Sequence, residues 1–437
     1  MELDREDQHS GKNLSNLWST SSDLAYCSAP GVNEKANYLV DPTTPEGYLT
    51  RISFSTKVKT KATGFYNPNL LPYPAGSEVP YFAIVRLSHR VNGLMLRHDL
   101  AYCDLKWADS RTINSRILEC TSPGTILDFG TEWTGTEEAC KRHPFLVLRQ
   151  GHTDPRVFFS PLGEPLMIVG TNGIHNCLGL FVIDLRVLIP ELAEKMQITE
   201  LPIRFGNMTE LGRPDLQEIE KNWFMIYDAI DSNREYLHYD FTNRALATLE
   251  PPSDPAMYNS IAKPSPELIT GLLQNFRKGS YSANDLHQAS NSLLVTMCDF
   301  PCVPTIHNTV LIELMHVKYA NYYRLYYRRF AIIMNATAPF DVIGRTENIM
   351  YAGVDSEMMV YTVSVVWDKQ HFHRHEPWNE TIHGTPDPAQ GKNPFVSDGY
   401  HGWLDDILMI NVGLDDHNSG VIHTTARDLL DCIKLVQ

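Results

Sequence analysis

Residues 156–169 read RVFFSPLGEPLMIV, so two short apolar runs flank the turn SPLGE at 160–164. Runs rich in Val, Ile, Phe and Leu favour extended backbone, whereas Pro and Gly favour turns. The stretch therefore predicts a β-hairpin.

The same alternation of apolar runs with clusters of Gly, Pro, Asn and Asp continues along the chain, which is the pattern of an all-β protein. We expect strands at 81–87, 145–149, 156–159, 165–169, 178–184, 223–227, 236–241, 293–297, 309–319, 322–334, 358–367 and 407–412. Only two helices are predicted, at 264–278, where apolar residues recur at helical spacing before Gly279, and at 425–435. Many short strands with polar connections predict a sandwich or a propeller, with a few peripheral helices.

Length and composition fit a globular protein with a sizeable core. The chain has 437 residues, of which 43% are hydrophobic. This length suits one large domain or two to three ordinary ones. The formal net charge of −15 repels nucleic acid and anionic membranes, so we expect no nucleic-acid partner. We find no apolar window long enough to span a bilayer and no signal sequence near Met1, and residues 1–20 are polar and predict a mobile arm.

Eight cysteines are spread over the whole chain, which is not the pattern of a small disulfide scaffold. We expect one or two disulfides formed in an oxidising compartment. Cys298 and Cys302 have no second close pair or His partner at zinc spacing, so a structural zinc site is not expected. Four Asn-X-Ser/Thr triplets, at Asn13, Asn207, Asn335 and Asn379, would be usable only in a secretory lumen.

Carboxylates stand directly before apolar runs at two places. The run HGWLDD at 401–406 precedes the apolar stretch 407–412, and GHTDPR at 151–156 places Asp154 before another strand. Because Asp resists burial without a partner, we expect the partner of Asp405 and Asp406 to be a ligand's hydroxyl groups or a cation. The alternative for 401–406 is an ordinary acidic turn, and the alternative for Asp154 is a cap on the turn before Pro155.

Arg156 lies two residues beyond Asp154, so on an extended strand both side chains point to the same face. Arg156 then either lowers the pKa of Asp154 or forms a structural salt bridge, and both can hold. His371, His373 and His375 also alternate and could form a metal site, but a polar loop is the favoured interpretation. We therefore assign no metal ligands.

Five motifs occur in one order: FYNPN at 65–69, a strand ending at Arg86, HTDPR at 152–156, EKNW at 220–223 and HGWLDD at 401–406. This succession resembles the fungal β-1,2-mannosyltransferases of glycosyltransferase family 91. It is more distantly similar to the β-mannoside phosphorylases and hydrolases with a five-bladed β-propeller. The resemblance covers about residues 65–430. It implies that 61–437 form a single catalytic five-bladed β-propeller and that 1–60 are an N-terminal arm and lead-in segment.

The resemblance implies an inverting transfer of mannose from GDP-mannose to a mannan or manno-oligosaccharide acceptor. Asp154 is then the general base that takes the acceptor hydroxyl proton. Asn67 and Arg86 grip the transferred mannose, and Lys221 and Asn222 hold the diphosphate. Asp405 binds mannose hydroxyls, Asp406 assists it or binds a metal, Trp403 stacks on a sugar face, and Arg156 and His401 complete the substrate-binding set.

No cofactor is firmly implied beyond the donor substrate, and the need for a divalent metal stays open. The family's membrane-bound members have a signal anchor that this chain lacks, so we expect the Golgi lumen if an anchor has been removed and a soluble protein otherwise. The aromatic and basic run YYRLYYRR at 322–329 either lines a guanine or mannan groove or forms a wall of the propeller.

Three functions remain open at this stage. The first is the β-1,2-mannosyltransferase, and the second is a β-mannoside phosphorylase or hydrolase on the same propeller. The third is a carbohydrate-binding propeller without catalysis. A hydrolase normally has two carboxylates that flank the scissile bond, and Asp405 could supply the second.

Overall fold

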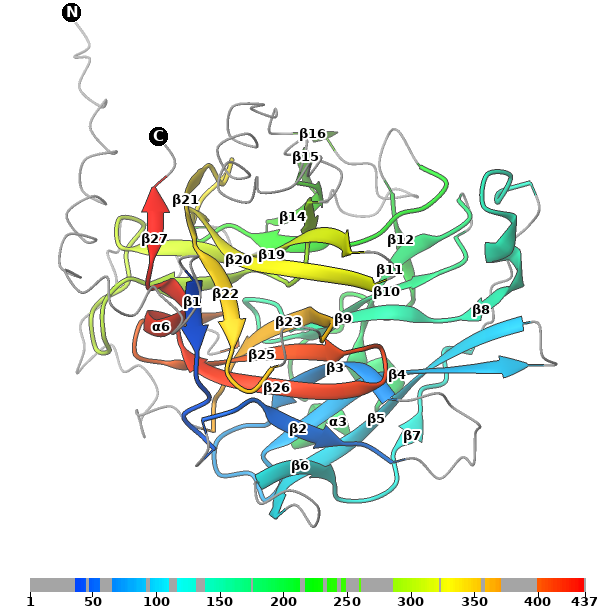
Figure 1. Ribbon diagram of the computed structural model, residues 1–437, viewed down its shortest axis with the longest axis horizontal. Helices are drawn as coiled ribbons and strands as arrows, with labels where there is room; N and C mark the ends of the chain where they lie inside the picture. Colours follow the sequence, from blue (N-terminus) through cyan, green and yellow to red (C-terminus); the bar gives the residue numbers. More distant parts are fainter. Residues whose placement is uncertain are drawn as a thin grey trace, which may run out of the picture.

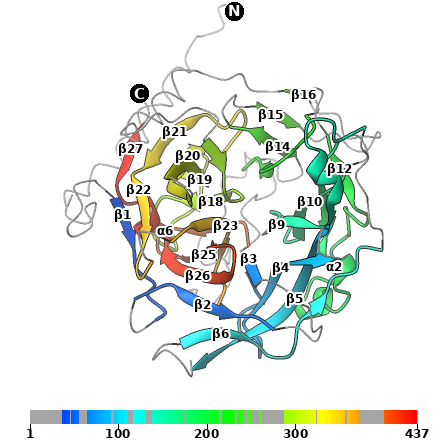
Figure 2. The ribbon, with the colours of Figure 1, turned by 45° about the vertical axis from the view of Figure 1, so that its right-hand side comes forward.

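The computed structural model describes residues 36–44, 47–55, 65–91, 95–109, 116–130, 138–173, 176–212, 217–230, 234–241, 245–248, 259–260, 286–321, 324–354, 358–370 and 399–435. Most of the described strands group into five four-stranded antiparallel blades around a common centre, and one strand joins the first and the last blade into one continuous sheet (Figures 1 and 2). The chain is therefore an all-β, five-bladed β-propeller, one of the two all-β folds that the strand pattern predicted and the one that the family resemblance implied.

The blades follow the chain in order. The first holds β3 (Phe65–Pro72), β4 (Tyr81–Val91), β5 (Met95–Asp109) and β6 (Arg116–Cys120), and the second holds β9 (Thr153–Phe159), β10 (Pro165–Thr171), β11 (Gly179–Asp184) and β12 (Thr209–Leu211). The third holds β13 (Phe224–Tyr227), β14 (Glu235–Asp240), β15 (Ala245–Thr248) and β16 (Asn259–Ser260). The fourth holds β18 (Leu293–Thr296), β19 (Thr309–Asn321), β20 (Arg324–Asn335) and β21 (Val342–Thr346). The fifth holds β23 (Val360–Trp367), β25 (Ile407–Leu414), β26 (Asn418–Thr425) and β2 (Thr50–Ser53).

Short elements surround the blades. The strands are β1 (Ala36–Leu39), which pairs with β22 (Asn348–Tyr351), and β7 (Thr125–Ile126), β8 (Arg149–Gly151), β17 (Leu286–Gln288), β24 (His401–Trp403) and β27 (Ile433–Leu435). The described helices are η2 (Pro144–Leu148), α2 (Leu185–Leu188), α3 (Leu192–Lys195) and α6 (Ala426–Leu430). No helix in these parts of the chain is long and apolar enough to cross a membrane.

The strand β2 closes the ring. It precedes the first blade in sequence, yet it pairs antiparallel with β26 of the last blade, with Thr50 opposite Val421. It also runs parallel to β6 of the first blade, with Ile52 opposite Leu118. Although we expected residues 1–60 to precede the domain, β2 is thus a strand of the propeller itself.

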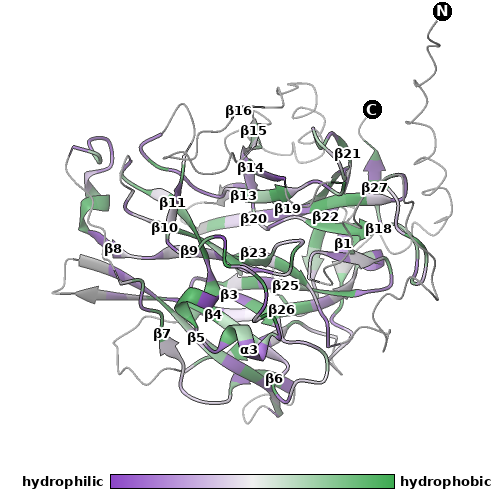
Figure 3. Ribbon diagram, turned by 180° about the vertical axis from the view of Figure 1, so that it is seen from behind, coloured by the Kyte–Doolittle hydropathy of each residue, from purple (hydrophilic) through white to green (hydrophobic). Residues whose placement is uncertain are grey.

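Both faces of a blade are buried, which explains the continuous apolar runs. In β10, Leu166 and Ile168 pack into one hydrophobic core, whereas Met167 and Val169 pack into a second core on the other face. Successive side chains of a strand point to opposite faces, so a blade between two neighbours needs apolar residues at every position. Figure 3 shows hydrophobic residues along the strands within the body of the molecule.

The hairpin predicted at 156–169 is present as β9 and β10. Its turn is closed by the amide of Ser160, which donates to the carbonyl of Glu164 at 3.0 Å, and Gly163 takes a φ of 85°. Glycine suits this position because a side chain would be strained there.

Two sequence-based assignments need correction. Residues 145–149 were expected to form a strand, but 144–148 form the 3-10 helix η2, because Pro144 fixes a helical φ at its start and Phe145 stays exposed. The closing helix expected at 425–435 ends at Leu430, and β27 follows it. The helix expected at 264–278 and the three histidines at 371–375 lie outside the described residues.

Three disulfides join described cysteines, more than the one or two expected. They are Cys103–Cys120, Cys140–Cys177 and Cys298–Cys302. Cys432 is also disulfide-bonded. Cys298 and Cys302 thus bond each other, which accounts for their close spacing.

A buried polar cluster fastens the closed ring. The imidazole of His423 on β26 lies between two carboxylates, with Nδ1 3.5 Å from Asp41 and Nε2 3.5 Å from Asp368, and all three side chains are fully buried. Thr50 of β2 donates to Asp41 at 3.1 Å. Burial opposes ionisation of Asp41, but the hydrogen bond and the charge of His423 hold the pKa of Asp41 below its ordinary value.

Replacing Asp41 by Asn should lower the free energy of unfolding at pH 7 by about 1–3 kcal/mol, because His423 and Thr50 lose a buried carboxylate partner while Asp368 still faces His423. Since the folded-state pKa of Asp41 is lowered, its contribution is present above the ordinary value of 3.8 and is lost as the pH falls through the folded-state value. Urea unfolding at pH 7 and at pH 3 measures both effects. The exposed Glu200→Gln is the control, and equal stability of Asp41→Asn and wild type at pH 7 would contradict this account of ring closure.

Candidate functional site

The innermost strands of the blades begin on one face of the propeller, and there they surround a cavity of about 290 Å³ that we call the axial cavity. Asn67 comes from β3, Asp154 from β9, Asn222 from the residue just before β13, and Tyr361 from β23. The other lining residues are Arg86, Lys221, His287, Lys318, Leu325, Tyr327, Met359 and Asp416. The turn between β25 and β26, which carries Asp416, lies toward the right-hand side of Figure 1.

The structure brings five of the predicted site residues together in the axial cavity. They are Asn67, Arg86, Asp154, Lys221 and Asn222. They are far apart in sequence but meet in space because four of them lie in, or just before, the innermost strand of a blade. Arg86 lies on β4, which pairs with the innermost strand β3. Their functional roles remain predictions.

The backbone of the axial cavity is unusual. Asn67, Asp154, Asn222 and Asp416 have φ values of 53°, 51°, 60° and 53°, in the left-handed region. Non-glycine residues adopt this conformation at a cost of about 1–3 kcal/mol each, and Asn and Asp tolerate it best. Such strain gathers at functional sites, where the surrounding structure holds it in place. Four of these residues around one cavity therefore support its choice as the candidate site.

Asp154 is held as a carboxylate by a group of cations. Arg86 Nη1 donates to Asp154 Oδ1, and the Asp154 side chain is 35% exposed. Burial raises the pKa of Asp154, but the positive charges of Arg86, Arg149 and Lys221 outweigh it and hold this pKa well below its ordinary value. Asp154 is therefore ionised at neutral pH, where it can accept a proton or a hydroxyl hydrogen bond but has no proton to give.

Contacts with His98 and Tyr66 hold the Arg86 side chain in place. Its Nη2 lies 3.1 Å from His98 Nδ1, and its guanidinium lies over the ring of Tyr66 at 5.2 Å. Burial, together with the positive charge of Arg86, lowers the pKa of His98, so the imidazole is neutral at physiological pH. Ser88 Oγ is 2.6 Å from His98 Nδ1 and completes this support.

Arg156 acts as a brace between two blades. It is 4% exposed, its Nη1 donates to the carbonyl of Val363 at 2.7 Å, and its Nη2 donates to Tyr361 Oη at 2.8 Å. As expected, Asp154 and Arg156 line one small cavity together, and the charge of Arg156 helps to lower the pKa of Asp154. Arg86, rather than Arg156, forms the ion pair with Asp154.

The sequence did not reveal Asp416, the second carboxylate of the axial cavity. It lies in the turn GLDDHN between β25 and β26. Burial, together with the negative charge of Asp154, raises the pKa of Asp416 despite the opposing effect of Arg86. Polar turns of this kind join most hairpins, so its sequence gives no distinguishing signal. Tyr327 belongs to the run 322–329 that the sequence did single out, and it lines the axial cavity. Lys318 of β19 and Tyr361 of β23 were not singled out.

The run at 401–406 lies away from the axial cavity, which corrects the expectation that it joins Asp154. β24 runs parallel to β18, with His401 opposite Leu294 and Trp403 opposite Thr296, the last residue of that inner strand. The run therefore continues past the ends of the inner strands, whereas the axial cavity forms where such strands begin.

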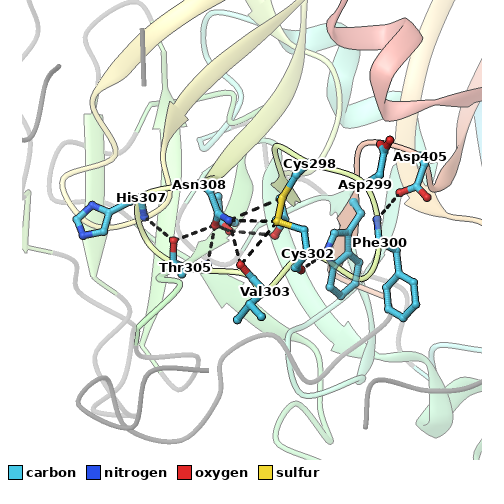
Figure 4. The surroundings of a disulfide bond; sticks show 12 residues. Cys298, Asp299, Phe300, Cys302, Val303, Thr305, His307, Asn308 and Asp405 are labelled. Carbon is cyan, nitrogen blue, oxygen red and sulfur yellow. Dashed lines mark hydrogen bonds between the residues drawn. A yellow bond between two sulfur atoms is a disulfide. The ribbon is translucent and has the colours of Figure 1, made fainter. Parts of the chain in front are cut away.

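The polar groups of this run are satisfied within the chain itself. Asp405 Oδ1 accepts from the amide of Phe300 at 2.9 Å, beside the Cys298–Cys302 disulfide (Figure 4). The further contacts are Trp403 N to Asp406 Oδ2 at 2.9 Å, Trp403 Nε1 to the carbonyl of Cys302 at 2.7 Å, and His401 Nε2 with Thr296 Oγ1 at 2.7 Å. Within the described residues, Asp405 and Asp406 thus each accept a hydrogen bond from a backbone amide, and their role in substrate binding stays a prediction.

Packing against Trp367 explains why residue 402 is a glycine. A side chain there would come within 2.6 Å of the ring of Trp367, so glycine allows β24 to approach that ring. Among the described residues, no group of three or more His, Cys, Asp or Glu side chains could hold a metal ion.

Comparisons with known proteins give fold-level likeness only. No protein-family model and no curated protein matches this chain. A solved glycosyl hydrolase from Bacteroides ovatus is 9% identical, with 93% of this chain and 92% of that chain covered and a TM-score of 0.41. An exo-1,5-alpha-L-arabinanase from a bovine ruminal metagenomic library is 10% identical over 84% and 95% of the two chains, with a TM-score of 0.32. An alpha-L-arabinanase of Cellvibrio cellulosa is 9% identical over 83% and 91%, with a TM-score of 0.31. At such identities the function has to be argued from the site itself.

Asn67 offers an unused acceptor in the axial cavity. Its Oδ1 is buried without a hydrogen-bond partner among the described residues. Gly413 makes room for it, because a Cβ at Gly413 would stand 2.2 Å from that oxygen. A buried acceptor without a partner is costly, and a water molecule or the hydroxyl of a ligand can supply the missing donor.

We expect Asn67→Gly to be more stable than Asn67→Ala by about 1 kcal/mol, because only glycine adopts the left-handed backbone without strain. Both variants should lose the ligand contact of the amide. Urea unfolding of the two variants measures the difference. If Asn67→Ala proves the more stable of the two, the strain assigned to this backbone is not present.

Proposed function

We propose that the chain is a carbohydrate-active enzyme that transfers mannose from GDP-mannose to a mannan or manno-oligosaccharide acceptor, with inversion and formation of a β-1,2 linkage. The observation that carries this proposal is the ionised Asp154 within a group of cations in the axial cavity. The nature of the donor and of the linkage is what the resemblance of the five motifs to the fungal β-1,2-mannosyltransferases implies.

The protonation state of Asp154 suits transfer from a nucleotide donor. A sugar hydroxyl that attacks the donor needs a base to take its proton, and an ionised carboxylate can accept one. The leaving diphosphate is already an anion and needs positive charge rather than a proton. In this mechanism the acceptor oxygen forms the new bond to the sugar's anomeric carbon, the bond to the diphosphate breaks, and Asp154 takes the hydroxyl proton.

Local charge in the axial cavity opposes the charge of the whole molecule. The chain carries −15 overall. Arg86, Lys221 and Lys318 nevertheless line the axial cavity with only two carboxylates, Asp154 and Asp416. Cations gathered in one cavity of an otherwise acidic protein favour the binding of an anionic group there, such as a diphosphate. Lys221 and Asn222 are the residues that we assign to it.

The remaining walls suit a sugar. Asn67 Oδ1 has no hydrogen-bond partner among the described residues, and Arg86 carries several donors, so the two can bind neighbouring hydroxyls. The aromatic rings of Tyr327 and Tyr361 also line the axial cavity and offer faces for a sugar or a base. The disulfides are consistent with an oxidising compartment such as the secretory lumen, which is the location that we propose.

A second candidate is a β-mannoside hydrolase or phosphorylase. The observation that favours it is the pair Asp154 and Asp416, whose surroundings push their pKa values in opposite directions. Such a pair can divide the roles of base and acid. Asp416 thus takes the place that we had expected for Asp405, which lies outside the axial cavity.

Asp154→Asn should fold and bind GDP-mannose but turn over more slowly by a factor of about 10²–10⁴, the usual cost of losing a general base. The assay mixes GDP-mannose with a manno-oligosaccharide and, in parallel, offers phosphate or water as acceptor to a β-mannoside. Asp299→Asn, at an exposed aspartate beside the Cys298–Cys302 disulfide, is the matched control. Proton NMR of the product should show a β-linked mannose.

The outcomes separate the candidates. A β-linked product from GDP-mannose supports the transferase, and release of mannose or mannose phosphate from a β-mannoside supports the second candidate. An α-linked product would exclude the inverting mechanism. Binding of oligosaccharides with no turnover of either substrate would leave a carbohydrate-binding propeller.

Lys221→Ala should weaken the binding of GDP by about ten- to a hundredfold and leave the binding of manno-oligosaccharides nearly unchanged, because the lost contact is charge-assisted and made to phosphate. Isothermal calorimetry with each ligand measures this. Lys195→Ala, which removes an ammonium from α3, is the control. Equal GDP affinities of Lys221→Ala and wild type would place the diphosphate elsewhere.

A further inference from the structure

A second cavity of about 260 Å³ opens beside the first blade, and we call it the rim cavity. It is bounded by β5, by the segment that follows β7, and by the end of β8. Its walls combine apolar side chains with polar ones. The lining residues are Arg97, Asp99, Leu100, Ile126, Leu127, Asp128, Phe129, Gly130, Gly151 and His152.

His152 gives the rim cavity an unused polar group. The residue is 6% exposed, and its Nε2 is buried without a hydrogen-bond partner in the described part of the chain. Burial lowers its pKa to about 4, so the ring is neutral at physiological pH. A neutral imidazole nitrogen pairs well with a hydroxyl group, because a hydroxyl can both donate and accept.

The rest of the rim cavity offers what a sugar ring needs. The ring of Phe129 stacks on His152 with centroids 3.6 Å apart, which gives an aromatic wall. The charged groups of the rim cavity are those of Arg97 and Asp99, and Arg97 Nε donates to Asp99 Oδ1 at 3.0 Å. Both side chains are partly exposed, which leaves donors and acceptors for hydroxyls. An apolar face next to a few fixed polar groups is the usual composition of a small-ligand site.

The rim cavity and the axial cavity are neighbours. His152 and Asp154 are two residues apart on one segment and line the two cavities separately. His98 connects them, because its carbonyl accepts from the amide of His152 at 3.0 Å while its imidazole supports Arg86. Gly151 permits this close packing, since a Cβ there would stand 1.9 Å from the carbonyl oxygen of His98.

From these observations we infer that the rim cavity is a distal subsite for a neutral hexopyranosyl residue of the oligosaccharide substrate, with His152 Nε2 bound to one of its hydroxyls. The inference rests on the proposed function, because it takes the axial cavity as the place where sugars react. An oligosaccharide that reaches from Asp154 toward His152 would then occupy both cavities, so longer acceptors should bind more tightly than short ones.

The test is calorimetric binding of three probes: GDP-mannose, β-1,2-mannobiose and β-1,2-mannotetraose. His152→Phe keeps an aromatic ring against Phe129 and removes the nitrogen. We expect it to weaken mannotetraose binding by about tenfold, the value of one good hydrogen bond, and to leave GDP-mannose binding unchanged. His307→Phe, at an exposed histidine, is the matched control and should bind all three probes like wild type.

Phe129→Leu is a second variant, which removes the aromatic wall and should also weaken mannotetraose binding. Melting temperatures identify variants that fold. The inference is overturned if wild type binds mannotetraose no better than mannobiose, or if both folded variants bind mannotetraose like wild type. Loss of mannotetraose affinity in His152→Phe supports the subsite even if wild type fails to turn over GDP-mannose, and that second result would reject only the proposed reaction.

Discussion

The pairing of β2 with β26 is the constraint on which the rest of the structure depends. A propeller is a ring of sheets, and each sheet buries both faces only if it has a neighbour on either side. The hydrogen bonds of Thr50 to β26 join the start of the described chain to the last blade, and the buried group Asp41, His423 and Asp368 secures the same place. With the ring closed, the inner strands converge, and their first residues meet around the axial cavity.

This convergence explains why strain and charge are concentrated in one place. Asn67, Asp154 and Asn222 all have left-handed backbone where an inner strand begins or is about to begin. Packed blades on both sides hold these conformations, so the strain persists in the folded state. The same geometry brings Arg86 and Lys221 beside Asp154, and their charges keep that carboxylate ionised although the whole molecule is acidic.

The opposite ends of the inner strands serve stability. There the Cys298–Cys302 loop and the run at 401–406 satisfy each other's polar groups, and Asp405 binds the amide of Phe300. Two acidic motifs of similar appearance, each placed before a strand, thus have different surroundings. Asp154 faces cations and a cavity, whereas Asp405 and Asp406 face backbone amides. Carboxylates need partners when buried, but the sequence does not say whether a partner is a cation, an amide or a ligand.

The sequence by itself determined the class of fold and most strands, because apolar runs between turn residues such as Gly163 are local signals. It also pointed to Asn67, Arg86, Asp154, Lys221 and Asn222 through their motifs. The sequence did not predict the 3-10 helix at 144–148, because Pro144 favours a helical turn at the start of an apolar run. It did not predict the role of β2 either, because ring closure pairs residues that are far apart in the chain. Only the tertiary structure decided that Asp416 enters the axial cavity, that Arg156 braces β23, and that the 401–406 run does not line that cavity. Those outcomes depend on which side chains become neighbours when the blades close, and that is a property of the ring rather than of any local stretch.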